Sequence, residues 1–475
     1  MKLRAILFGA IAATLGGCAR FESKPLSAAQ VATEFQARSL DSPALKEFVE
    51  TSMHQTFEIW PPKEWNFSTL TLVAFYYHPS LAVARAQWAV AAAGVRTAGG
   101  QPNPVLAVTP GYSSNPAQGI SPWFPMVSFD VPIETAGKRR KRITHAGYVS
   151  ESARLNIATA AWQVRSSVRS GLLDYCVAQR RAAFLQKQVA AMEQIAELLG
   201  QKAEVGALAG SEVAPSRVAL FKARLDLADA QRQIAEARVN LAEATGVSVN
   251  SFQDSNFSFD FDREPTGVKN LTSMEIQRQA LLSRSDILRA LAEYAADEST
   301  LRLEIAKQYP DVHLNPGYQF DQGEHKWSLG ISVDLPLLNR NQGPIAEAEA
   351  RRKETAARFN ELQAKVLAEI DRATAVFRVT EANSDALQLL SDDQAKQRVS
   401  VEQKFRVGAA ERLDLLSAEV ESNATELALL DGQLKLQRSI GALENGVQRP
   451  LSGAVSSAEL SLERSEIPIN KADRE

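Results

Sequence analysis

The side chains best suited to bind a metal ion or to catalyse a reaction are scattered along this 475-residue chain. No two of its five histidines share a ligand spacing on one helix or hairpin; they are His54, His78, His145, His313 and His325. With two cysteines, the chain has no cysteine cluster that would complete a metal site. No nucleophile, base and orienting residue occur together in an active-site pattern. The sequence therefore predicts no enzyme, no cofactor and no metal site within one chain.

One cysteine stands where its thiol would accept an acyl chain. A short basic region and an apolar run at residues 5–14 are followed by Leu15-Gly16-Gly17-Cys18. This order resembles a bacterial lipoprotein signal, which implies a signal peptide at residues 1–17, lipidation of Cys18 and, with Ala19 next, sorting to the outer membrane. The alternative is a plain signal peptide with an incidental cysteine. Once Cys18 is lipidated, Cys176 lacks a disulfide partner within the chain, and we expect it to be a small packed residue in a helix.

The chain contains two copies of one unit. Residues 79–112 align without a gap with residues 285–318, at an offset of 206 residues. The match includes Thr109-Pro110-Gly111-Tyr112 against Asn315-Pro316-Gly317-Tyr318. Each copy should therefore contain the same elements in the same order.

Each copy carries a predicted hairpin of two amphipathic strands, at residues 105–133 and 311–336. Apolar residues take every second position: Leu106, Val108, Pro110, Tyr112, Val127, Phe129, Val131, Ile133, Val312, Leu314, Pro316, Tyr318, Phe320, Trp327, Leu329, Ile331, Val333 and Leu335. A period of two places one set of side chains on each face, and about nine residues form a tilted strand that crosses a bilayer. One hairpin cannot cross alone, because its edges would leave backbone groups unpaired in lipid.

A very long helix follows each hairpin, over about residues 138–202 and 344–404. At 1.5 Å per residue, roughly 60 residues form a rod of about 90 to 100 Å. Both rods end in a matching turn, at 201–207 and 403–409, whose glycine suits a helix reversal. The returning helices show the seven-residue spacing of coiled coils: Leu220, Leu227, Ile234, Leu241, Leu429, Leu436 and Leu443.

Over about residues 70–447, these features together resemble the TolC-type outer-membrane efflux proteins. They are the lipoprotein signal, the duplicated unit, Pro102-Asn103-Pro104, the strand exits Asp130-Val131-Pro132-Ile133 and Asp334-Leu335-Pro336-Leu337, and the paired Val-Gly-Ala turns. The stretch from Ile133 to Arg140, with Arg142, is similar to the CzcC-like branch, which serves heavy-metal efflux pumps.

The resemblance implies a mainly α-helical fold with a transmembrane β part. Each unit would run helix, strand, strand, long helix, turn, helix. Three chains would form a 12-stranded β-barrel, continued by a long α-helical barrel. The barrel residues expected to face lipid are Val108, Tyr112, Phe129, Val131, Leu314, Tyr318, Trp327, Leu329, Ile331 and Val333. The opposite phase, with His313, would face a water-filled lumen.

The expected organisation has six parts. They are the signal peptide (1–17), an N-terminal periplasmic extension (18–67), the first efflux repeat (68–246), an equatorial linker (247–270), the second efflux repeat (271–447) and a C-terminal tail (448–475). The extension and the linker should wrap the middle of the helical barrel.

The resemblance also assigns roles to the two tips, at 201–212 and 403–414. Docking of a periplasmic adaptor would involve Val205, Gly206, Ala207, Val407, Gly408 and Ala409. A periplasmic gate would be lined by Glu212, Asp414 and Phe405, although Ala203 stands where the first repeat should match Phe405. The alternatives are a plain helix-reversal turn, and acids that favour the dipole at a helix start.

The implied function is that of an outer-membrane channel component of a tripartite efflux system. The protein would be a passive exit duct, anchored by lipid in the bacterial outer membrane and extending into the periplasm. Its partners would be two further copies in a homotrimer, a periplasmic adaptor, an RND-type inner-membrane pump and outer-membrane lipid, with heavy-metal cations as a candidate substrate. A net charge of −3 does not indicate nucleic acid. Two alternatives stay open: the duct of a type I protein secretion system and a structural periplasmic coiled-coil lipoprotein.

Overall fold

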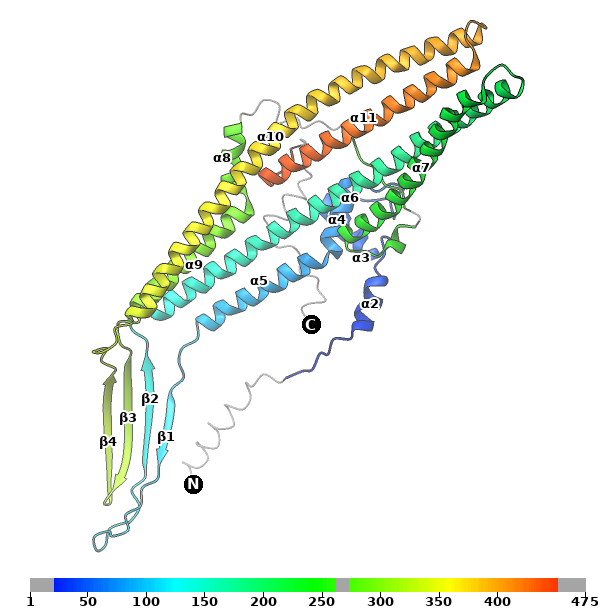
Figure 1. The fold of residues 1–475 in the computed structure, drawn as a ribbon. Coiled ribbons are helices and arrows are strands. Elements are labelled where there is room, and N and C mark those ends of the chain that lie inside the picture. The colour runs from blue at the N-terminus through cyan, green and yellow to red at the C-terminus, as the bar shows by residue number, and fades with distance from the viewer. Residues whose placement is uncertain (1–20, 254, 262–272, 452–475) are drawn as a thin grey trace.

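The computed structural model describes residues 21–253, 255–261 and 273–451. The molecule is elongated, with a sheet at one end and two pairs of long helices that extend away from it (Figure 1). The predicted signal peptide, Cys18, part of the linker and the tail beyond residue 451 lie outside the described residues.

The predicted duplication is confirmed by the order of the elements. The first copy consists of α4 (Phe67–Tyr77), α5 (Pro79–Ala98), β1 (Val105–Thr109), β2 (Met126–Ile133), α6 (Lys138–Glu204) and α7 (Gly210–Thr245). The second consists of α8 (Ser273–Ser283), α9 (Ser285–Ala306), β3 (Val312–Asp321), β4 (Glu324–Val333), α10 (Gln342–Arg406) and α11 (Arg412–Val447). Before and between them lie α2 (Ala28–Gln36), α3 (Pro43–Met53) and the short 3₁₀ helix η1 (Val249–Phe252).

The four strands form one antiparallel sheet in the order β1-β2-β3-β4. The two hairpins are therefore joined by pairing of β2 with β3, which brings the two copies side by side. Gln322 and Gly323 close the second hairpin with positive φ angles of 52° and 86°, the geometry of a two-residue turn.

The long helices α6 and α10 contain 67 and 65 residues, so each is about 100 Å long at 1.5 Å per residue. Both begin after a residue in the left-handed conformation, Gly137 (φ 68°) and Asn341 (φ 61°). Both end at a turn glycine, Gly206 (φ 75°) and Gly408 (φ 76°). None of the described helices has a stretch apolar and long enough to cross a membrane.

The returning helix α7 packs on α6 through two interleaved heptad series. The predicted positions Leu220, Leu227 and Ile234 are half-buried, and Leu241 is buried. A second series, missed in the sequence, is more deeply buried and consists of Ala223, Ala230, Ala237 and Ala244. Alternating large and small residues let the two helices pack closely.

The largest core surrounds the middle of α6, where α3, α4 and the segment after α7 pack against it (Figure 1). The N-terminal extension contributes Leu45 and Val49, and the linker contributes Phe252 and Phe257. Trp65 pairs with Phe257 through an isolated β-bridge. Cys176 is buried in this core as predicted, and burial raises the pKa of its thiol to about 11.

Candidate functional site

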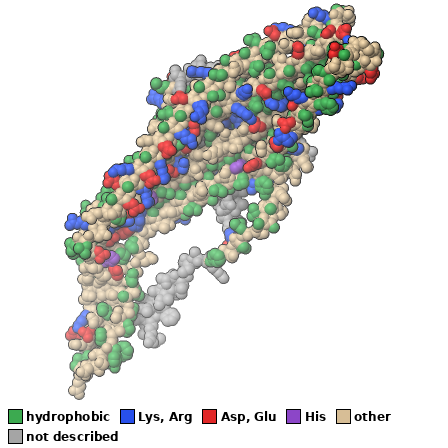
Figure 2. Space-filling view, in the orientation of Figure 1, with side chains coloured by type: hydrophobic (Ala, Val, Ile, Leu, Met, Phe, Trp, Pro, Cys, Tyr) green, Lys and Arg blue, Asp and Glu red, His purple; other side chains and the backbone are tan. Residues whose placement is uncertain are grey.

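The strand registers place the predicted apolar positions of all four strands on one face of the sheet. Leu106 lies opposite Phe129, Val127 opposite Tyr318, and Tyr318 opposite Trp327. Trp327, Leu329 and Ile331 are all strongly exposed, and apolar side chains lie along this end of the molecule in Figure 2. An exposed apolar face that runs across a whole sheet marks a surface that contacts lipid or protein.

Tyr112 is the one predicted lipid-facing residue that lies outside a strand. β1 ends at Thr109, because Pro110 has no N–H to donate to the ladder. Tyr112 then forms an isolated bridge with Trp123, and their ring centroids are 5.0 Å apart. The alternation therefore continues past a break in the first hairpin.

The opposite face of the sheet carries small and polar residues. His313 Nδ1 lies 2.8 Å from Asp130 Oδ1, and Asn315 Nδ2 donates to Ser332 Oγ at 3.0 Å. These bonds hold the polar side chains flat along the sheet. In the part of the chain that the structure describes, no three histidine, cysteine or acidic side chains cluster as metal ligands.

A tight set of polar contacts holds the sheet to the helices at the β2–β3 seam. The Lys138 ammonium is 2.8 Å from Asp311 Oδ1, and Thr135 donates from its N–H to the same oxygen at 2.8 Å. The Thr135 hydroxyl donates to Pro310 O at 2.6 Å, and Arg142 pairs with Glu134. Lys138 is buried, so this seam is fixed by charge within the chain.

The two tips have the same backbone geometry. Ala207 N donates to Lys202 O at 2.8 Å, and Ala409 N donates to Lys404 O at 2.8 Å, the long-range bond of a glycine-terminated helix end. Val205 is 80% exposed and Val407 79% exposed. Each tip therefore presents one apolar side chain and a bare glycine to the surroundings.

The predicted gate residues lie just after these turns. Asp414 accepts a hydrogen bond from Glu411 N at 2.8 Å as part of a capping box, so it also stabilises the start of α11. Glu212 lies in the first turn of α7. Phe405 contacts the guanidinium of Arg412, whose carbon is 5.8 Å from the ring centroid.

Two contacts join the tip regions of the two copies, and the sequence did not reveal them. Lys202 Nζ lies 2.8 Å from Glu411 Oε2, and Arg412 donates to Gln194 Oε1 at 2.7 Å. Both contacts are exposed. Their partners lie more than 200 residues apart, so no local pattern could identify them.

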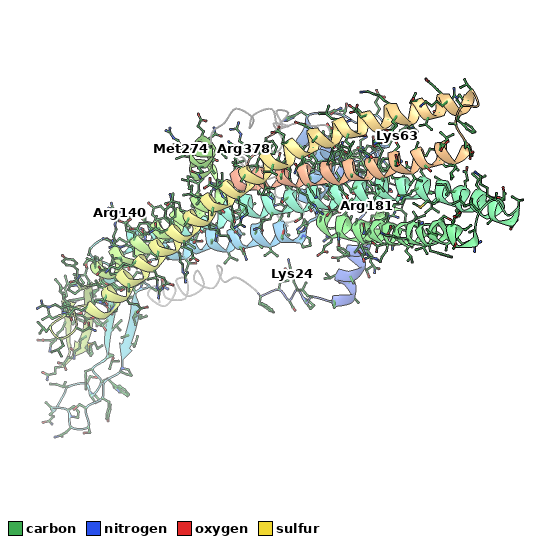
Figure 3. All side chains as sticks on the ribbon, turned by 45° about the horizontal axis from the view of Figure 1, so that its top comes forward. Lys24, Lys63, Arg140, Arg181, Met274 and Arg378 are labelled. Carbon is green, nitrogen blue, oxygen red and sulfur yellow. The ribbon has the colours of Figure 1, made fainter. Side chains whose placement is uncertain are left out.

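Further pairs join α6 to α11 nearer the middle of the rods. Arg181 pairs with Asp431, and Arg438 lies 2.8 Å from Asp174 Oδ1. Figure 3 shows Arg181 about midway along the rods and Arg140 near the sheet. The two copies are therefore held together along the rods, well beyond the sheet.

A cluster of three buried charges lies between α6 and α11. Glu444 Oε2 is 2.9 Å from Arg165 Nη1 and 3.7 Å from Arg169 Nε. Arg169 also donates to the backbone oxygen and the side-chain oxygen of Gln437, at 2.6 and 2.9 Å. Burial lowers the pKa of the Arg169 guanidinium, and the nearby Glu444 carboxylate opposes that shift.

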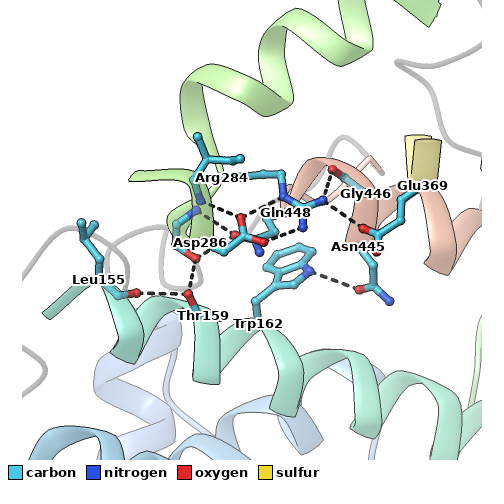
Figure 4. A network of polar contacts seen from close by, with 11 residues as sticks. Leu155, Thr159, Trp162, Arg284, Asp286, Glu369, Asn445, Gly446 and Gln448 are labelled. Atoms are coloured by element: carbon cyan, nitrogen blue, oxygen red, sulfur yellow. Dashed lines mark hydrogen bonds and ion pairs between the residues drawn. The ribbon is translucent and has the colours of Figure 1, made fainter. Parts of the chain in front are cut away.

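A second polar network clamps the end of α11 against the corner between α8 and α9 (Figure 4). Arg284 donates to Gly446 O at 2.7 Å, and the Ser285 hydroxyl donates to Gln448 Oε1 at 2.7 Å. The Trp162 indole donates to Asn445 Oδ1 at 3.1 Å. The C-terminal end of the second copy is thus fixed to the first copy through α6.

Comparisons with known proteins agree with this architecture. A family model described as outer membrane efflux protein matches residues 75–247 and 276–445. The cobalt-zinc-cadmium resistance protein CzcC of Cupriavidus metallidurans is 23% identical over 221 residues, which cover 46% of this chain and 51% of that protein. The alignment therefore spans about half the length of this relative.

Two solved structures share the fold. The outer-membrane channel OprN is 16% identical, covers 92% of this chain and 99% of its own, and has a TM-score of 0.67. The outer membrane protein VceC from Vibrio cholerae is 19% identical, covers 81% of this chain and 96% of its own, and has a TM-score of 0.64. The long rods and the small sheet thus recur together in other chains.

Proposed function

Because the chain belongs to the outer membrane efflux protein family, we propose that three copies form a passive exit duct through the outer membrane. The observation that carries this proposal is the register of the sheet. It gathers the apolar positions of four strands on one exposed face and leaves β1 and β4 at the edges. Lipid accepts such a sheet only when its edges are closed by further strands.

Three copies supply twelve strands, enough for a barrel with an aqueous lumen. The apolar face then contacts lipid, and the face with Asp130, His313 and Ser332 lines the lumen. The helices continue the tube for about 100 Å into the periplasm. Cys18, at the end of the apolar N-terminal segment, carries the lipid that anchors the chain in the same membrane.

At the far end of the tube, the tips dock a periplasmic adaptor that delivers substrate from an RND-type inner-membrane pump. The exposed apolar side chains support this role, because Val205 and Val407 sit beside open glycines at the far ends of the rods. Glu212, Asp414 and Phe405 line the entrance that opens for passage. The energy for transport comes from the pump, since a tube without a catalytic site only conducts.

The substrates that we propose are divalent heavy-metal cations. The support is the similarity to a protein named for cobalt, zinc and cadmium resistance. A lumen lined by hydroxyl, amide and carboxylate groups also suits hydrated cations. In the described part of the chain no metal-binding cluster would retain such ions.

The test is a conductance record of the purified protein in planar bilayers. We expect stepwise conductance, and a reversal potential under a ZnCl₂ gradient that shows preference for the cation. Absence of conductance from both the wild-type protein and Asp414→Asn, in which the entrance should stay open, would refute the duct and favour a structural coiled-coil lipoprotein. Conductance with a preference for anions would retain the duct and refute the metal substrate.

A further inference from the structure

The repeat within the chain predicts how one chain pairs with the next chain in the ring. We propose that β4 of one copy and β1 of the following copy pair with Leu335 opposite Val108 and Leu337 opposite Leu106. We further propose that this seam has no ion pair at the place where Lys138 pairs with Asp311 in the equivalent seam inside the chain. The inference rests on the proposed function, in which further copies close the sheet.

The two copies of the unit correspond residue by residue at the sheet. Residues 105–112 correspond to 311–318, at an offset of 206, and residues 130–138 correspond to 334–342, at an offset of 204. The offset of 204 also relates the two left-handed helix starts, Gly137 and Asn341. The correspondence therefore extends from the strands into the long helices.

The observed hairpins confirm that this correspondence carries the strand register. In the first hairpin Leu106 pairs with Phe129 and Val108 with Val127. The corresponding residues of the second repeat are Val312 with Val333 and Leu314 with Ile331. Both are pairs of the second hairpin, so the two hairpins have the same register.

The same correspondence between repeats, applied to the β2–β3 pairing inside the chain, predicts the pairing between β4 of one chain and β1 of the next. Within the chain, Val131 pairs with Leu314, Ile133 with Val312, and Val127 with Tyr318. Each β2 residue is replaced by its counterpart in the second repeat, and each β3 residue by its counterpart in the first repeat of the next chain. The pairs then become Leu335 with Val108, Leu337 with Leu106, and Ile331 with Tyr112. Every pair joins two apolar residues, so the apolar face continues across the seam without a change of side.

The end of β4 supports this pairing. β2 continues to Ile133, but β4 ends at Val333, four residues before the counterpart Leu337. Leu335 and Leu337 are exposed, and the segment after β4 projects beyond the sheet on the β4 side in Figure 1. Pairing with β1 of a second chain extends β4 over these four residues and places both leucines on the apolar face of the sheet.

The chemistry of the two seams differs. Across the seam inside the chain, Lys138 and Thr135 both contact Asp311. Their counterparts at the seam between chains are uncharged: Gln342, Asn339 and Val105. Val105 is exposed. The seam between chains therefore lacks the ion pair that joins the two repeats inside the chain.

The order of the strands sets the order of the chains around the ring. β2 and β3 are paired on both sides within the chain, which leaves β1 and β4 with free edges. Pairing of two unlike edges is the head-to-tail contact that closes a ring. β1 begins with Val105 and presents no charge to the incoming β4. The sheet therefore closes from β4 of one chain to β1 of the next.

The helices show the same asymmetry. Inside the chain, α6 of the first repeat packs along α11 of the second repeat. The equivalent pair, α10 with α7, makes no comparable contact among the described residues. Val376 and Val379 of α10 are exposed. In the proposed ring, α10 of one chain is the long helix that faces α7 of the next chain.

Disulfide crosslinking between copies tests the register. Directly opposite residues of an antiparallel pair have Cα atoms about 4.5 to 5.5 Å apart, within the range of about 4.4 to 6.8 Å that a disulfide needs. Diagonal neighbours are about 7 to 8 Å apart. In a Cys176→Ser background, the matched pairs are Leu335→Cys with Val108→Cys, and Leu337→Cys with Leu106→Cys. The crossed pairs, Leu335→Cys with Leu106→Cys and Leu337→Cys with Val108→Cys, are the controls.

After mild oxidation in isolated outer membranes, we expect covalent dimers and trimers on denaturing gels from both matched pairs. The crossed pairs should remain monomeric. Val131→Cys with Leu314→Cys, the equivalent pair inside the chain, reports that oxidation works, because it forms an intrachain disulfide. Crosslinking by the crossed pairs in intact trimers would overturn the proposed register and leave the duct standing. A wild-type protein that is monomeric in the membrane would refute the duct itself.

Discussion

Removal of the Glu444 carboxylate should destabilise the protein more than any change at a surface ion pair. Glu444 is 3% exposed and lies between Arg165 and Arg169, which are 5% and 9% exposed. In Glu444→Gln, both buried guanidinium groups lose the Glu444 carboxylate. Breaking a buried pair by removing one partner costs about 3 to 5 kcal/mol. We expect a loss near the lower limit, because glutamine still accepts a hydrogen bond.

The assay is urea unfolding of the detergent-solubilised protein, followed by circular dichroism of the helices. Glu402→Gln is the matched control, because Glu402 pairs with Arg406 on the same kind of helix but both side chains are exposed. An exposed pair of this spacing contributes about 0.3 to 0.5 kcal/mol. The two variants should therefore differ about sixfold or more in their effect.

A second variant separates charge from packing. Arg165 stacks on Phe67 and Trp162, with its guanidinium carbon 4.8 and 4.7 Å from the ring centroids. Arg165→Met combined with Glu444→Gln restores the original net charge of the cluster and keeps the site filled. We expect the double variant to recover part of the lost stability. A Glu444→Gln loss equal to that of Glu402→Gln would refute the reasoning.

Three further outcomes follow from the sheet and the tips. Ile331→Lys places a charge on the face assigned to lipid, which should lower the stability of the barrel by about 2 to 4 kcal/mol and abolish trimers on native gels. Ser332→Lys, on the opposite face, should still form trimers. Equal assembly of the two variants contradicts the assigned lipid face. Bulky replacements at Gly206 or Gly408, both with positive φ and open surroundings, should leave trimers intact but raise metal sensitivity in cells; unchanged resistance argues against docking. Asp414→Asn should let small solutes leak into the periplasm, and unchanged permeability removes Asp414 from the gate.

Much of this architecture could be predicted from the sequence because the signals are local and occur twice. The alternation of the strands, the long helices without internal proline and the glycine turns each depend on a few consecutive residues, and each recurs in both copies. The register confirmed that the apolar positions share one face. Two strands were predicted too long: Pro110 interrupts the ladder of the first, and β4 ends at Val333, before Leu335.

The contacts between the two copies could not be predicted in the same way. Glu444 and Arg165 are 279 residues apart, and neither belongs to a pattern that names its partner. Arg284 and Gly446 meet only because α11 ends beside the corner between α8 and α9. In the helices, arginine and glutamate also occur throughout exposed surfaces. Burial, which distinguishes these few from the rest, depends on the assembled fold.

The helical counterparts of the buried charges extend the argument made for the sheet. At the offset of 202, which relates the tips and the buried positions of these helices, Arg165 corresponds to Leu367, Arg169 to Asp371 and Glu444 to Ala242. The Asp371 carboxylate accepts a hydrogen bond from Gln277 of its own chain at 2.6 Å. The contact between copies therefore contains none of the arginines that join the repeats inside the chain. A buried charge is costly to desolvate and is stable only beside its specific counter-charge. Such contacts suit two repeats of one chain, because the covalent link already brings the partners together. Apolar surface is non-directional and suits separate chains that must first meet and then close a ring.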